Sequence, residues 1–334
     1  MSEYVIMPAT DYKSMCDIVR SALRKTDLIK SGDMPSHISS LIDKIGKAVF
    51  KSTNMPSAGM WSSVTYGNGK FVAIKEDSNE AAYSTDGINW NATTLPDNTG
   101  WISVTYGDGR FVAIGYRSNI AAYSTDGVTW HSSTLPQNQA WSSVTYGNGK
   151  FVAVSVGSGI TGFSTIAYSS NGGETWNYSH FDYSLYLSSV TYGNGKFVAV
   201  AQSSGSYVSV YSLDGINWTS ISVNGLHSIT YGNDRFVAVG TGVAKYSDDG
   251  ISWTVCSLPK TCDFFSIAYG DNKFIALSSS SLAYSTDGSS WIEATFPEGN
   301  YWNDITFGDG KFVATQRQTS TSVAAYCDMA VEIA

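Results

Sequence analysis

A unit of about forty residues recurs in tandem along most of this 334-residue chain. One copy, from Trp61 to Pro96, reads WSSVTYGNGKFVAIKEDSNEAAYSTDGINWNATTLP. Ser63 serves as a marker for the repeat, and its equivalents in the later copies are Ser103, Ser143, Ser189, Ser228, Ser266 and Asp304. Because tandem units bury their apolar faces against their neighbours, this repeat constrains the fold more than any other feature.

Each copy predicts four short β-strands. Residues 61–67 and 70–75 are rich in β-branched and aromatic side chains, and the Gly-Asn-Gly sequence between them suits a tight hairpin turn. Residues 81–84 supply a third strand, and the Thr-rich stretch after Trp90 supplies a fourth. Four strands in roughly forty residues is the period of a propeller blade. We therefore predict an all-β fold, a seven-bladed β-propeller of four-stranded antiparallel blades.

The fourth strand of the last copy is predicted to come from the other end of the repeat region. After residues 324–328 no Asp-Gly turn and no Thr-rich strand follow, whereas residues 50–61 match residues 90–101 almost position for position. We expect residues 48–56 to complete the seventh blade, which would close the ring and cover an exposed strand edge. The predicted domains are residues 1–47 and the propeller of residues 48–334.

The segment before the propeller has helical rather than strand periodicity. Its apolar residues form two stripes, one of Met15, Ile18, Val19, Ala22 and Leu23 and one of Ile38, Leu41, Ile42 and Ile45. We expect a short helical N-terminal segment of two helices. A pair this small makes no core of its own, so it should pack on the propeller, on another protein or on copies of itself, which leaves a homo-oligomer open.

Charge and cysteine spacing exclude several classes of ligand. The formal net charge is −8, and residues 48–334 alone carry 13 basic and 22 acidic residues, or −9. This surface disfavours nucleic acid and acidic membranes. No apolar run is long enough for membrane insertion. The cysteines show no CxxC spacing, so we predict neither a metal nor a cofactor, and Cys256 and Cys262 are either bridged or free thiols.

A second motif lies between the third and fourth strands of most copies. Residues 168–176, YSSNGGETW, fit the Ser-x-Asp-x-Gly-x-Thr-Trp pattern with Asn171 in the Asp place, and shorter copies begin at Ser84, Ser124, Ser212, Ser247 and Ser285. Residues 48–334 thereby resemble the Asp-box propellers, which include sialidases and many non-enzymatic binding proteins. We expect the Asp to bind amides of its own turn and the Trp to pack between blades, both structural roles.

The residues that a sialidase needs are not apparent. Such an enzyme uses an arginine triad, a Tyr nucleophile with a Glu partner, and an acid. Arg110 and Arg235 occupy a turn position of the repeat, so only Arg117 and Arg317 remain in the propeller, and the four histidines are scattered. We interpret the propeller as non-catalytic and predict that the chain is not an enzyme.

The leader carries a resemblance of its own. Residues 12–38, from Tyr12 to Ile38, are similar to the leader of tail and baseplate-associated proteins of phages and prophages of Gram-positive bacteria. The resemblance implies attachment to virion tail or baseplate proteins through the N-terminal helices. It also implies synthesis in the host cytoplasm and a final location in the virion tail or tail tip.

Repetition separates the two faces of the predicted ring. The Gly-Asn-Gly and Asp-Gly turns share one face and barely vary, whereas the loops on the other face differ at every blade. Recognition residues are expected in such variable loops. Aromatic, Arg, amide and hydroxyl groups there suit a cell-surface glycan or wall polymer. The candidate ligand-binding residues are Tyr116, Arg117, Phe181, Tyr183, Tyr186, Tyr207, Tyr301 and Arg317.

Three functions are compatible with these features. The first is a phage tail-associated receptor-binding protein, or adhesin, that recognises a bacterial surface glycan. The second is a structural or decoration subunit whose propeller contacts other virion proteins. The third, a glycoside hydrolase, lacks a recognisable acid and nucleophile set.

Overall fold

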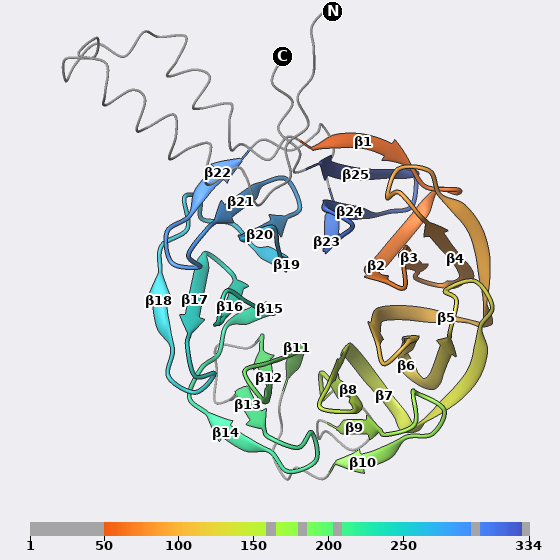
Figure 1. Ribbon diagram of the computed structural model, residues 1–334, viewed down its shortest axis with the longest axis horizontal. Helices are drawn as coiled ribbons and strands as arrows, with labels where there is room; N and C mark the ends of the chain where they lie inside the picture. The colour runs from red at the N-terminus through yellow and green to blue at the C-terminus, as the bar shows by residue number, and fades with distance from the viewer. Residues whose placement is uncertain (1–49, 158–164, 180–185, 203–208, 295–300, 329–334) are drawn as a thin grey trace, which may run out of the picture.

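The computed structural model describes residues 50–334 except 158–164, 180–185, 203–208, 295–300 and 329–334. Within these ranges the chain is all-β, with strands β1 to β25 and no helix. The sheets stand around a common axis as a ring, with the inner strands facing the axis and the outer strands at the rim (Figure 1). This is the architecture of a β-propeller. The predicted helices of residues 10–47 lie outside the described residues.

Three consecutive repeat units form separate four-stranded antiparallel sheets. The first has β11 (Leu187–Gly193), β12 (Lys196–Ala201), β13 (Ser209–Ser212) and β14 (Thr219–Ile221). The second has β15 (Leu226–Gly232), β16 (Arg235–Gly240), β17 (Val243–Ser247) and β18 (Thr254–Cys256), and the third has β19 (Phe264–Gly270), β20 (Lys273–Ser278), β21 (Leu282–Ser285) and β22 (Ile292–Ala294). The prediction of four-stranded antiparallel sheets is confirmed.

The other strands are hydrogen-bonded into one continuous sheet. They are β1 (Lys51–Asn54), β2 (Gly59–Gly67), β3 (Lys70–Lys75), β4 (Ser78–Ser84), β5 (Asn91–Gly107), β6 (Arg110–Ser124), β7 (His131–Gly147), β8 (Lys150–Ser155), β9 (Ile166–Ser169), β10 (Asn177–Ser179), β23 (Trp302–Gly308), β24 (Lys311–Gln318) and β25 (Val323–Asp328). The sheet is continuous because β5 and β7 each serve as the outer strand of one unit and then as the inner strand of the next, and because β2 pairs with β24 of the last unit.

The β2–β3 hairpin shows how the repeat sequence fixes its local structure. Tyr66 pairs with Phe71 and Gly67 with Lys70, which leaves Asn68 and Gly69 as the two turn residues. Their φ angles are +46° and +71°. Left-handed backbone at both positions is what a two-residue hairpin turn requires, and Asn and Gly adopt it most readily. The Gly-Asn-Gly turn predicted from the sequence is confirmed.

The apolar core lies between neighbouring units. Phe71 and Ala73 of β3 pack in a cluster with Val313 and Ala324 of the last unit. Their neighbours on the same strand, Val72 and Ile74, pack instead with Trp101, Phe111 and other residues of the following unit. Because side chains alternate across a strand, one strand serves two interfaces, which explains why these strands are apolar on both faces.

The two ends of the described chain are joined by strand pairing. β1 pairs with β25 in antiparallel register, with Lys51 opposite Tyr326 and Asn54 opposite Val323. Figure 1 shows β1 at the rim outside β25, with β24 and β23 further in. The outer strand beside β25 is therefore supplied by the residues that precede the first complete repeat.

Two further sequence predictions concern cysteines and membranes. Cys256, Cys262 and Cys327 are free thiols. No helix in the described ranges is both long and apolar enough to cross a membrane.

Candidate ligand-binding face

Connectivity assigns each loop to one of two faces of the ring. The hairpin turn between β2 and β3 and the turn between β4 and β5 share one face, here called the turn face. The β3–β4 connection and the segments that enter β2, β11 and β23 share the opposite face, here called the loop face.

The Asp-box turns on the turn face use their carboxylates internally. The Oδ1 of Asp86 accepts hydrogen bonds from the N–H groups of Ile88 and Asn89, both at 2.8 Å, and from the hydroxyl of Ser84 at 2.9 Å. Burial on its own raises the pKa of Asp86, but the hydrogen bonds from Asn89, Ile88 and Ser84 outweigh it and hold that pKa well below its usual range. These carboxylates stabilise their own turns, as the sequence predicted.

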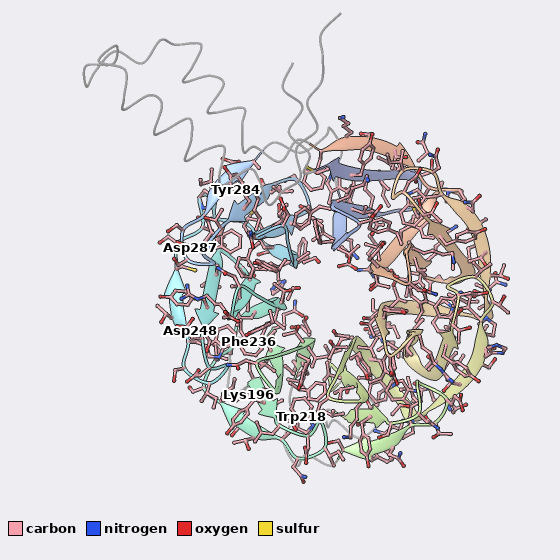
Figure 2. All side chains as sticks on the ribbon, in the orientation of Figure 1. Lys196, Trp218, Phe236, Asp248, Tyr284 and Asp287 are labelled. Atoms are coloured by element: carbon pink, nitrogen blue, oxygen red, sulfur yellow. The ribbon has the colours of Figure 1, made fainter. Side chains whose placement is uncertain are left out.

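Basic side chains on the turn face are also engaged in contacts between units. The Nε of Arg235 donates to Asp248 Oδ1 at 2.7 Å, and its Nη1 donates to the Asp287 carbonyl at 2.8 Å. Figure 2 labels Asp248 and Asp287 on neighbouring units. Arg110 reaches Glu174 of the next unit in the same way, at 2.6 Å. The arginines of the turn position therefore link adjacent turns.

On the loop face an ion pair joins the first complete repeat unit to the last one. The Nε of Arg317 donates to Glu76 Oε2 at 2.6 Å and its Nη2 to Oε1 at 2.8 Å. The Glu76 side chain is only 11% exposed. The hydrogen bonds with Glu76 raise the pKa of Arg317 above its usual value, and Asp77 and Tyr116 add to the effect. A bidentate pair of this kind fixes the guanidinium in one orientation.

The backbone around this ion pair is held by the strands that meet there. Met60 of β2 pairs with Arg317 of β24, and the N–H of Glu76 donates to the Met60 carbonyl at 2.8 Å. The N–H of Arg317 donates to the carbonyl of Tyr301, also at 2.8 Å. Tyr301 lies on the surface, 57% exposed, with a φ of +69°. Tyr301, Glu76 and Arg317 are thus placed by one set of main-chain bonds.

Tyr116 and Arg117 extend the cluster to the next unit. The guanidinium of Arg117 lies 5.1 Å from the ring centroid of Tyr116, and Arg117 has a left-handed φ of +51°. Gly100 lies between Tyr116 and Asp77, because a Cβ at Gly100 would meet Asp77 Oδ1 at 3.6 Å and Tyr116 Cβ at 3.7 Å. Together Glu76, Asp77, Tyr116, Arg117, Tyr301 and Arg317 form what we call the loop-face cluster.

Of the remaining candidates, Tyr186 alone lies among the described residues, and it is not part of the loop-face cluster. Tyr186 is exposed just before β11, which lies across the ring from β24 (Figure 1). Phe181, Tyr183 and Tyr207 lie outside the described residues. Sequence reasoning missed Glu76 and Asp77, because their role depends on Arg317, which is 241 residues from Glu76.

A small cavity lies beside β2, β4 and β5, and none of its lining residues belongs to the loop-face cluster. Its volume is about 230 Å³, and it is lined by Pro56, Ser57, Trp61, Glu80, Ala81, Ala92, Thr93 and Thr94. Glu80 Oε2 accepts hydrogen bonds from Lys75 Nζ and Ser57 Oγ, both at 2.6 Å. The bond from Lys75 lowers the pKa of Glu80, and the bond from Ser57 adds to this. In the described part of the chain, no three His, Cys, Asp or Glu side chains are grouped so as to hold a metal ion.

Comparison with known proteins finds likeness in structure only. No family model matches the sequence, and no curated protein matches it. The chain is similar to virginiamycin B lyase from Staphylococcus aureus, with 13% identity and a TM-score of 0.73 over 83% of this chain and 98% of the lyase. A streptogramin B lyase is 13% identical, with a TM-score of 0.74 over 85% of this chain and 98% of the lyase. YCF48, in a structure with bound D1 peptide, is 16% identical, with a TM-score of 0.65 over 83% of this chain and 96% of YCF48.

These neighbours support the β-propeller fold and correct one prediction. We had excluded catalysis from the sequence, chiefly because a sialidase set of residues is missing. The prediction that the chain is not an enzyme is wrong, because the lyases are enzymes that have the same fold. The sialidase residues are only one way to build an active site on a propeller, so their absence does not decide the matter.

Proposed function

We propose that this protein binds a bacterial cell-surface glycan or wall polymer through its loop face, as a receptor-binding protein of a phage tail or tail-like particle. The observation that carries the proposal is the loop-face cluster, in which side chains from three units meet. Its residues differ from those at the same positions of other units, whereas the turn face repeats. Such blade-specific side chains on a rigid ring are suited to recognition.

The chemistry of the cluster matches a neutral, hydroxyl-rich ligand. Tyr301 and Tyr116 provide aromatic faces, which pack on the C–H faces of sugar rings. Two guanidinium groups, of Arg117 and Arg317, are balanced by two carboxylates, of Glu76 and Asp77. The cluster therefore offers donors and acceptors without net charge, which suits hydroxyl groups better than a polyanion.

The architecture proposed from the repeat is a ring of seven blades. The Ser63 marker and its equivalents occur seven times, and β1 supplies a strand beside β25. Residues 48–334 would then form the propeller, and residues 1–47 would attach it to tail or baseplate proteins. The leader resemblance is the basis for placing the protein in the virion tail, and the neighbouring genes test that placement.

A glycan array and a host-cell binding assay with the full chain test the proposed function. We expect the double variant Arg117→Ala/Tyr301→Ala to lose binding by tenfold or more, roughly the loss of one good contact. Tyr178→Ala is the matched control, because Tyr178 is 50% exposed on the outer strand β10, away from the cluster. Absence of binding to every glycan and envelope fraction by the unmodified protein would contradict the proposal.

A further inference from the structure

One position of the inner strand has a structural role that recurs around the ring. The hydroxyl of Ser62 donates to the Trp101 carbonyl of the next unit at 2.6 Å. The equivalents Ser142 and Ser188 donate to the carbonyls of Leu187 and Leu226 at 2.6 and 2.9 Å. Serine therefore ties the inner strand to the next one in these three units, whereas Ile102 and Asn303 occupy the same position in two others.

The two remaining units, which are consecutive, carry an aromatic ring at this position. The equivalent residues are His227 in β15 and Phe265 in β19, neither of which carries a hydroxyl. Their rings lie next to each other, with centroids 5.7 Å apart and planes inclined by 34°. Phe265 is nevertheless 39% exposed. The exposed part of the Phe265 ring, next to the imidazole of His227, presents a flat apolar surface to solvent that a ligand can cover.

The loops around this pair are short and leave it open on the loop face. β16 and β17 are joined by Thr241 and Gly242 alone, because Gly240 already pairs with Val243. β20 and β21 are joined by residues 279–281, whereas residues 156–165 join β8 and β9. Leu226 and Phe264, which precede the two rings, lie at the start of their strands and pair with the last residues of β16 and β20. The two rings therefore lie at the loop-face end of the inner strands.

Polar groups surround the aromatic pair. The Oγ1 of Thr241 lies 3.4 Å from Nε2 of His227, and Thr241 forms an isolated antiparallel bridge with Asp263. Asp263 is exposed. Burial lowers the pKa of His227, and the Asp263 carboxylate opposes that change. The site thus combines a flat apolar ring with a hydroxyl, an imidazole and a carboxylate at its edge.

We propose that Phe265 and His227 form a binding site for one pyranose ring of a neutral sugar, distinct from the loop-face cluster. The C–H face of the sugar would stack on Phe265, and its hydroxyl groups would bond to His227, Thr241 and Asp263. The Asp263 carboxylate disfavours sugars that carry a carboxylate or phosphate. The inference rests on the proposed function only in taking the ligand to be a glycan. β15 and β19 lie across the ring from β6, which carries Tyr116 and Arg117, whereas β23, which follows Tyr301, is the neighbour of β19 (Figure 1); the two sites share no residue.

The test uses the full chain and a panel of methyl glycosides of glucose, galactose, mannose and N-acetylglucosamine. Binding is followed by saturation-transfer NMR and by titration calorimetry. We expect at least one glycoside to bind, and Phe265→Ser and His227→Ser to weaken it by about tenfold. Phe265→Trp should retain binding. Both serine variants introduce the residue that three other units carry at this position, so their melting temperatures should match that of the parent protein.

Ile292→Ser is the matched control, because Ile292 is an apolar side chain that is 53% exposed on the outer strand β22. Unchanged affinity in the Phe265→Ser and His227→Ser proteins, or no binding of any glycoside by the parent protein, overturns the inference. If Arg117→Ala/Tyr301→Ala loses binding to the host envelope while no glycoside binds at Phe265, the inference fails and the proposed function stands. If glycosides bind at Phe265 but no envelope glycan binds, the proposed function fails alone.

Discussion

The carboxylate of Asp304 accepts a hydrogen bond of 2.9 Å from the backbone N–H of Val64, across 240 residues of sequence. At other junctions the acceptor is a serine hydroxyl, as between Ser63 and the N–H of Val104 at 3.3 Å. Asp304 also accepts a bond of 2.7 Å from the Ser266 hydroxyl. The one acidic residue in this series therefore lies where the last inner strand meets the first. Burial raises the pKa of Asp304, against the bonds from Ser266 and Val64.

Replacing Asp304 tests the importance of this junction. In Asp304→Ala the Val64 N–H and the Ser266 hydroxyl lose their acceptor, so we expect the free energy of unfolding to fall by about 1–3 kcal/mol. Asp304→Ser restores the acceptor of the other junctions and should recover most of that loss. Chemical denaturation of the two variants beside the parent measures the difference. Equal stability of Asp304→Ala and the parent protein would show that the bond contributes nothing.

The Asp-box carboxylates predict how stability depends on acid. Burial raises the pKa of Asp126, but bonds from Thr129, Val128 and Ser124 outweigh it and lower that pKa from 3.8 to about 2. The folded state therefore holds its proton less readily than the unfolded state. The stabilisation is complete above pH 3.8 and is lost as the pH falls through about 2.

Asp126→Asn removes this titration while keeping the turn. Asn171 already occupies the same place in its own unit, where its Oδ1 accepts from the Ser169 hydroxyl at 2.9 Å and the Thr175 N–H at 3.0 Å. We expect the variant to lose less melting temperature than the parent between pH 3.8 and about 2. Parallel melting curves for the two proteins over that range would contradict the assignment.

The close contact between Gly67 and Tyr106 predicts a severe packing defect. A Cβ on residue 67 would lie 2.0 Å from Cγ of the Tyr106 ring in the next unit. Gly67→Ala should therefore force the two inner strands apart and lower the free energy of unfolding by about 3 kcal/mol or prevent folding. Gly69→Ala is the control. A Cβ there meets nothing within 4 Å, so its cost is only the strain of a φ of +71°, about 1 kcal/mol. A larger loss in Gly69→Ala than in Gly67→Ala would be inconsistent with this packing.

The pairing of β1 with β25 predicts that the residues before the first full repeat stabilise the ring. Phe50 and Met55 are buried, and the Met55 N–H donates to the Ser322 carbonyl at 2.5 Å. Deleting residues 1–56 should expose the β25 edge, lower the melting temperature and promote aggregation. Deleting residues 1–46 leaves β1 in place and should not. The two deletion proteins are compared by thermal melting and light scattering, and identical behaviour would refute the role of β1.

Most of the fold was predictable because the determining signals are local and repeated. The Asn68–Gly69 turn follows from residues that adopt positive φ. The apolar run from Phe71 to Ile74 indicated a strand covered on both faces, and the structure places alternate side chains in two different clusters. The match of residues 50–61 to residues 90–101 indicated which segment supplies a late strand. Each inference uses a local pattern of turn residues or alternating side chains, and this pattern recurs in several repeat units.

The candidate site was predictable only in part. Tyr116, Arg117, Tyr301 and Arg317 were selected because the sequence predicts variable loops at these positions. The structure instead places Tyr116 and Arg117 within β6 and Arg317 within β24, and it brings the four residues together. Glu76 and Asp77 were not selected, since no sequence pattern near Glu76 indicates that it pairs with Arg317. The pattern also gave no reason to single out Phe265, which follows another phenylalanine in an ordinary inner strand.

Local sequence patterns are enough to predict the strands, their turns, the faces that they bury and the structural role of the Asp-box carboxylates. These follow from backbone geometry and side-chain alternation within about ten residues, which a linear pattern records. Only the tertiary structure decided which single residues meet, as with Arg317 and Glu76, Asp304 and Val64, or His227 and Phe265. Those contacts depend on the curvature of the ring and on loop lengths, which set distances between units and leave no periodic trace in the sequence.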